Sequence, residues 1–148
     1  MDKIVFITGA SSGIGAGCAR KFASQGASLI LNARNVNKLS ALKEELEKQY
    51  GAKIYLLPFD VRDRKAATSA LESLPKEWQS IDILVNNAGL VIGTDKEQEG
   101  SLDEWDIVID TNIKALLAMT RLIVPGMVER KRGHIINIGY IAGDAADP

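Results

Sequence analysis

A glycine-rich segment near the N-terminus is the part of the sequence best suited to bind an anion. Residues 8–15 read Thr-Gly-Ala-Ser-Ser-Gly-Ile-Gly, directly after an apolar run and directly before a segment with helical spacing. Glycines there permit a tight turn, so that free N–H groups at the helix start can face a diphosphate, aided by the helix dipole. The alternative is a turn that only packs a helix on a strand. The expected dinucleotide contacts are Gly9, Ser11, Ser12, Gly13, Ile14 and Gly15.

The segment that follows the second apolar run favours NADP over NAD. NAD sites commonly place an acidic residue about 20 residues beyond the glycine loop, where it holds the ribose 2′-hydroxyl. This chain has Asn-Ala-Arg-Asn at residues 32–35 instead. The guanidinium of Arg34 can hold a 2′-phosphate through charge-assisted hydrogen bonds, helped by the Ser11 hydroxyl. An Arg34 that is simply solvated is the alternative.

Five short apolar runs, separated by longer segments with helical spacing, predict the sheet that positions these residues. Most of the runs are apolar throughout rather than alternating, which is typical of parallel strands covered on both faces. Right-handed crossovers then give a three-layer, Rossmann-like, doubly wound α/β fold with the strand order 3-2-1-4-5. The expected strands cover residues 3–8, 28–33, 53–58, 82–86 and 134–139.

Four helical segments connect these strands. The first is expected to begin at Ser12 or Gly13 and to end at Gly26. The second covers residues 37–50, and the third begins after Asp63, a good N-cap, and ends near residue 74. The fourth covers residues 101–130, with a capping box formed by Ser101 and Glu104 and a bend near residues 125–126. The residues expected to face inward are Ile14, Cys18, Ala19, Phe22, Ala23, Leu39, Leu42, Leu46, Ala66, Ala67, Ala70 and Leu71.

Length and composition indicate a single globular domain over residues 1–148. The chain is 46% apolar and 25% charged, with a formal net charge of −1, so no general attraction to nucleic acid or anionic lipid is expected. One cysteine excludes an internal disulfide, and one histidine does not indicate a metal site. Only four consecutive apolar residues precede Thr8, far fewer than a signal peptide or spanning helix requires. We therefore expect a cytoplasmic protein.

The sequence resembles the short-chain dehydrogenase/reductase family over essentially its whole length. Residues 8–15 match the family's Thr-Gly-x-x-x-Gly-x-Gly motif, and residues 86–89 match its Asn-Asn-Ala-Gly motif. Segments 84–90, 125–130 and 133–139 look most like the NADP-dependent 3-hydroxy acid and serine dehydrogenases. The resemblance implies an adenine contact at Asp60 and Val61, a cofactor border at Asn87, Ala88 and Gly89, and a catalytic role for Asn112.

The other catalytic residues of that family are not matched. Tyr140 occupies the position of the family's catalytic Ser, and the Tyr-x-x-x-Lys motif is expected beyond residue 148. Tyr140 cannot replace the missing acid/base, because Asp144 stands where the lysine should be and its charge would raise the phenol pKa. We expect no meaningful turnover from residues 1–148 alone.

The sequence is consistent with three functions. The favoured one is a truncated dehydrogenase half that binds NADP. The second is a dehydrogenase that is active only with a complementing C-terminal segment, and the third is a truncated or engineered scaffold that has lost cofactor binding. A homodimer is also predicted. Its interface would be either an uncovered fifth strand or the fourth helical region around Leu116, Leu117 and Met119.

Overall fold

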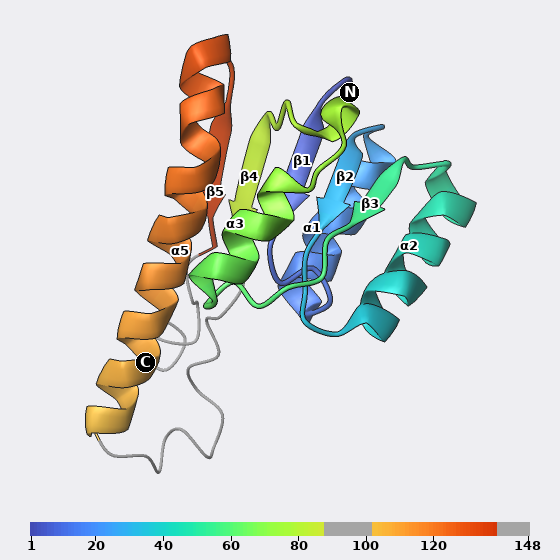
Figure 1. Cartoon of the computed structure of the whole chain (residues 1–148). Helices are drawn as coiled ribbons and strands as arrows, with labels where there is room; N and C mark the ends of the chain where they lie inside the picture. Colours follow the sequence, from blue (N-terminus) through green and yellow to red (C-terminus); the bar gives the residue numbers. More distant parts are fainter. Residues whose placement is uncertain (88–101, 139–148) are drawn as a thin grey trace, which may run out of the picture.

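The computed structural model describes residues 1–87 and 102–138, which fold around a five-stranded parallel sheet. The strand order β3-β2-β1-β4-β5 confirms the predicted order (Figure 1). Each strand lies within its predicted run and is shorter at one or both ends. The strands are β1 (Ile4–Ile7), β2 (Ser28–Leu31), β3 (Ile54–Leu56), β4 (Ile83–Asn86) and β5 (His134–Asn137).

Two helices, α2 (Val36–Tyr50) and α3 (Arg64–Glu72), begin at side-chain N-caps. Asn35 and Asp63 each accept a hydrogen bond at 3.1 Å from the backbone N–H three residues later, which starts α2 and α3. Gly51 ends α2 in the left-handed conformation, with φ of 63°. Helix α5 continues through Pro125, so the predicted bend does not interrupt it. The helices are α1 (Gly13–Ser24), α2 (Val36–Tyr50), α3 (Arg64–Glu72), the 3₁₀ turn η1 (Lys76–Trp78) and α5 (Leu102–Arg130).

Alternate strand residues face two separate cores, which gives three layers. On β1, Val5 and Ile7 pack with α1 and α2, whereas Phe6 packs with α3, η1 and α5. β2 and β4 alternate in the same way. Strand β5 lies at the edge of the sheet, and its four residues are all exposed. In residues 1–87 and 102–138 no helix is both long and apolar enough to cross a membrane.

Two predictions of helix faces are partly wrong, one for a buried residue and one for an exposed residue. Ile14 was expected in the core but is 51% exposed, because α1 turns Gly15, Ala16, Ala19 and Ala23 toward the sheet instead. Met119 was expected on an uncovered face of the fourth helical region. It is 1% exposed and packs against the sheet, Leu116 is half-buried, and Leu117 is 57% exposed.

Candidate functional site

The predicted binding residues gather at the carboxyl ends of neighbouring strands. The glycine loop follows β1, Arg34 follows β2, Asp60 follows β3 and Asn87 follows β4. In a doubly wound parallel sheet this edge holds the ligand crevice. The structure therefore brings together residues that are separated by up to 79 positions in the sequence.

Two glycines of the loop are required by the fold itself. Gly9 has φ of 61°, a conformation that glycine adopts without strain. A Cβ on Gly15 would clash with the Gly9 carbonyl and lie 2.6 Å from Nδ2 of Asn87. Helix α1 can therefore approach the end of β1 this closely only because residue 15 lacks a side chain.

Gly13 is different, because nothing in the described protein requires a glycine at this position. No described atom lies within 4 Å of the place where its Cβ would be. A side chain there would extend into open space at the first residue of α1. This space is what a ligand needs in order to approach the backbone closely, so the loop fits a bound diphosphate.

The start of α1 also leaves backbone donors for such a ligand. Ser12 is the N-cap, but its hydroxyl donates to the Gly9 carbonyl at 2.9 Å and does not cap the helix. The first turn holds no acidic residue, and among the described residues no acceptor meets the N–H groups of Gly13 and Ile14. These amides and the positive end of the helix dipole favour an anion.

Asn87 fastens the glycine loop to the end of β4. Its backbone N–H donates to Oγ1 of Thr8 at 2.9 Å, and its Nδ2 donates to the Gly9 carbonyl at 3.1 Å. The Thr8 hydroxyl donates in turn to the carbonyl of Val85 at 3.3 Å. Asn87 thus holds the loop in shape from behind, which is a structural role beside the predicted cofactor contact. The predicted contacts Ala88 and Gly89 lie outside the described residues.

A shallow hollow lies beside the loop, where the sequence predicted a phosphate. It is lined by Ser11, Arg34, Asn35 and Lys38, so the predicted pair of Ser11 and Arg34 does face one space. Arg34 is exposed and forms no ion pair with any described residue. Lys38 was not predicted, because Arg34 precedes α2 and Lys38 lies in its first turn, so no helical spacing relates the two side chains.

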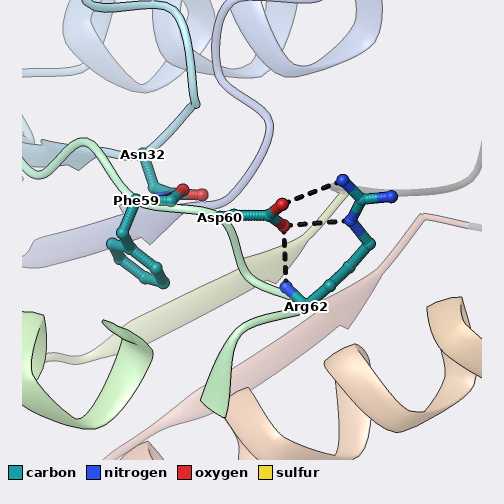
Figure 2. A network of polar contacts seen from close by, with 4 residues as sticks. All are labelled: Asn32, Phe59, Asp60 and Arg62. Atoms are coloured by element: carbon teal, nitrogen blue, oxygen red, sulfur yellow. Dashed lines mark hydrogen bonds and ion pairs between the residues drawn. The ribbon is translucent and has the colours of Figure 1, made fainter. Parts of the chain in front are cut away.

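The carboxylate of Asp60 is held by Arg62, as Figure 2 shows. Nε and NH2 of Arg62 donate to the two carboxylate oxygens at 3.0 and 2.8 Å, and the backbone N–H of Arg62 donates at 2.9 Å. These contacts with Arg62 lower the pKa of Asp60, and the nearby charge of Arg34 lowers it further. Arg62 was not among the predicted residues, because the spacing of an Asp and an Arg does not show whether their side chains face each other.

Asn32 fixes the position of Asp60 relative to β2. Its Nδ2 donates to the carbonyls of Leu57 and Phe59 at 3.1 and 3.0 Å, which ties the segment after β3 to the end of β2. Val61, a predicted adenine contact, is only 6% exposed and packs in the core below α3. Its main chain is therefore the part of Val61 that can meet a ligand.

Asn112, the predicted catalytic residue, lies on α5 and is directed under the crevice. It is 5% exposed, and its Nδ2 has no hydrogen-bond partner among the described residues. It lines a cavity of about 10 Å³ together with Thr8, Val61 and Asn86. Tyr140 lies outside the described residues, so its predicted place in the Ser position is not tested.

Comparison with known proteins identifies a family. The family model described as short chain dehydrogenase matches residues 3–148. The NADP-dependent 3-hydroxy acid dehydrogenase YdfG of Escherichia coli strain K12 is 49% identical over 140 residues, which are 95% of this chain and 55% of that protein. The chain thus spans about half the length of the curated relatives it matches, and the predicted family resemblance is confirmed.

Solved structures agree with this assignment. A crystal structure of serine dehydrogenase from Escherichia coli matches with a TM-score of 0.81 and 48% identity, covering 95% of this chain and 63% of that one. The closed form of serine dehydrogenase complexed with NADP⁺ matches with a TM-score of 0.78 and 47% identity, covering 95% and 55%. The predicted fold class is therefore confirmed as well.

Proposed function

The chain belongs to the short chain dehydrogenase family, and from this premise we propose that residues 1–148 form an NADP(H)-binding domain. One observation carries the proposal. The uncapped start of α1, open at Gly13, lies at the same sheet edge as a hollow lined by two cations, Arg34 and Lys38. A dinucleotide with a 2′-phosphate needs both of these features.

The charges support NADP over NAD. Ser11, Arg34, Asn35 and Lys38 line the hollow without a carboxylate that could hold a 2′-hydroxyl or repel a 2′-phosphate. The chain as a whole carries a net charge of −1, so attraction of a phosphate must come from this local group. The relatives named above point to the same cofactor.

For the whole protein we propose an oxidoreductase that acts on a small hydroxy acid. The bound nicotinamide would accept or supply the hydride. Of the residues that act on the substrate, this chain holds Asn112, whose buried amide is directed under the crevice. With Tyr140 in the Ser position and no Tyr-x-x-x-Lys in residues 1–148, proton transfer requires a complementing C-terminal segment. Residues 1–148 alone bind the cofactor without turnover.

We also propose that the isolated chain forms a homodimer. Strand β5 is an exposed sheet edge, and Ile135 and Ile136 are 38% and 39% exposed on it. On α5, Leu117 and Val128 are more than half exposed. Edges and apolar patches of this kind promote association. A monomer at high micromolar concentration in analytical ultracentrifugation would contradict this.

Titration calorimetry with NADP⁺ and NAD⁺ tests the proposed function. We expect saturable binding of NADP⁺ at micromolar to high micromolar concentration, and weaker binding of NAD⁺. No heat of binding with either dinucleotide at millimolar concentration would contradict the proposal and would leave a scaffold without a cofactor.

A further inference from the structure

Asp60 and Arg62 form an ion pair near the binding crevice. Three hydrogen bonds join the two residues, and both carboxylate oxygens are engaged (Figure 2). The pair is not enclosed, since the side chains of Arg62 and Asp60 are 45% and 33% exposed. The carboxylate of Asp60 therefore lies at the surface of the crevice, and its negative charge is neutralised by the guanidinium of Arg62.

The pair lies next to the phosphate hollow, because Arg34 and Asp60 follow the paired strands β2 and β3, whose ends are joined by the hydrogen bond from Asn32 to the Phe59 carbonyl. The charge of Arg34 contributes to lowering the pKa of Asp60, although Arg62 contributes more. Two cations thus lie near one anion, and the direct contact is made by Arg62 alone. Arg34 remains without an ion pair among the described residues and faces the hollow.

We propose that Arg62 is a positioning residue that sets the preference for a 2′-phosphate by holding and neutralising Asp60, so that Arg34 stays available to the phosphate. This inference rests on the proposed NADP(H) binding. It assigns to Arg62 a role in selectivity that is exerted through another side chain and not through contact with the phosphate.

Removal of Arg62 should weaken binding of a 2′-phosphate in two ways. The unmatched carboxylate of Asp60 repels a 2′-phosphate. It also attracts Arg34, because an exposed guanidinium turns toward the nearest unmatched carboxylate. A ligand with a free 2′-hydroxyl suffers neither effect. The ratio of the two affinities is therefore the informative quantity, since any general damage to the crevice would weaken both ligands alike.

The test is the ratio of NAD⁺ to NADP⁺ dissociation constants, with NADP⁺ measured by calorimetry and NAD⁺ by competition against it, at low ionic strength. Arg62→Gln should lower this ratio roughly three- to tenfold, and Arg62→Lys should lower it less. The double variant Asp60→Asn/Arg62→Gln should restore the ratio to within about twofold of Asp60→Asn, because no carboxylate remains to be neutralised. Arg64→Gln removes the same charge two residues away and should leave the ratio within about twofold of wild type.

Other outcomes would overturn either the role of Arg62 or the proposed function. Equal weakening of both dinucleotides by Arg62→Gln, an unchanged ratio, or no recovery in the double variant would overturn the role of Arg62. A wild-type chain that binds neither dinucleotide would overturn the proposed function itself, and the inference with it. Thermal unfolding of each variant shows whether it is folded. If Arg62→Gln does not fold, failure of the Arg62→Lys and double-variant arms overturns the inference.

Discussion

The backbone N–H of Asn87 donates a hydrogen bond to Oγ1 of Thr8 at 2.9 Å, which joins the ends of two neighbouring strands, β4 and β1. Because Thr8 is 2% exposed, this contact lies under the glycine loop and not within the open part of the crevice. The glycine loop is therefore supported by a hydrogen bond between the ends of β1 and β4. Its shape is set by β4 as much as by β1.

Thr8→Val should destabilise the chain with little change in volume. The substitution leaves the N–H of Asn87 without its acceptor, and a buried unsatisfied group costs about 1–3 kcal/mol. Thr8→Ser keeps the oxygen and should lose less. Urea unfolding monitored by circular dichroism measures both variants, and equal stability of Thr8→Val and wild type would show that the strands do not depend on this contact.

Gly13 and Gly15 should respond in opposite ways to alanine. Gly15→Ala forces a Cβ against the Gly9 carbonyl and should lower the free energy of unfolding by about 1–3 kcal/mol. Gly13→Ala meets open space and should change stability by no more than about 0.5 kcal/mol. The same methyl would obstruct the diphosphate and weaken NADP⁺ binding about tenfold or more. Normal NADP⁺ affinity in a stable Gly13→Ala chain would place the ligand elsewhere.

Arg34→Ala and Lys38→Ala should each weaken NADP⁺ more than NAD⁺. Hydrogen bonds to a charged group contribute about 1.5–3 kcal/mol, which corresponds to roughly 10–100-fold for Arg34. Lys38 offers a point charge and should contribute less. Lys48→Ala, on the far end of the same helix, is the control for loss of positive charge. Dissociation constants for both dinucleotides measure the effect, and an equal loss for NAD⁺ and NADP⁺ would argue against a 2′-phosphate in this hollow.

The ion pair of Asp60 and Arg62 should stabilise the chain only above acidic pH. Arg62 lowers the pKa of Asp60 in the folded chain, so the pair contributes fully above the unfolded pKa of about 3.9. The contribution is lost as the pH falls from there through the lowered folded value. Stability curves for wild type and Arg62→Gln should therefore converge below about pH 4. A difference that stayed constant from pH 6 to pH 3 would mean that Arg62 stabilises the fold by another route.

The order of the strands could be predicted from the sequence, because it depends on the apolar runs and the connections between them and not on individual side-chain contacts. Apolar runs such as residues 29–31 and 83–85 must be covered on both faces, and right-handed crossovers leave few ways to arrange them. It is harder to predict which side of a helix faces the sheet. Ile14 was wrongly expected to be buried, because helical spacing shows which residues share a side of the helix but not whether that side faces the sheet. In α1 the close contact of Gly15 with Gly9 sets which side faces the sheet.

Only part of the candidate site could be predicted from the sequence, because some of its residues are marked by a motif and others are brought together only by the fold. Residues that act through their backbone or lie directly after a strand, such as Gly13 and Arg34, are marked by their position in a motif. The pairing of Arg62 with Asp60 depends instead on a turn after β3, which Asn32 holds from another strand. Contacts of this kind follow from tertiary structure, and the spacing of residues 60 and 62 does not reveal them.

NADP(H) binding as proposed requires that the start of α1 and the end of β2 together hold the diphosphate and the 2′-phosphate of one dinucleotide. The most direct measurement is a ¹H–¹⁵N NMR titration of the chain with NADP⁺, followed by the same titration with NAD⁺. We expect both ligands to shift the amide signals of Gly13 and Ile14, and NADP⁺ to shift the Arg34 signals much more strongly than NAD⁺ does. Shifts that are absent at these residues, or that gather elsewhere in the chain, would contradict the account.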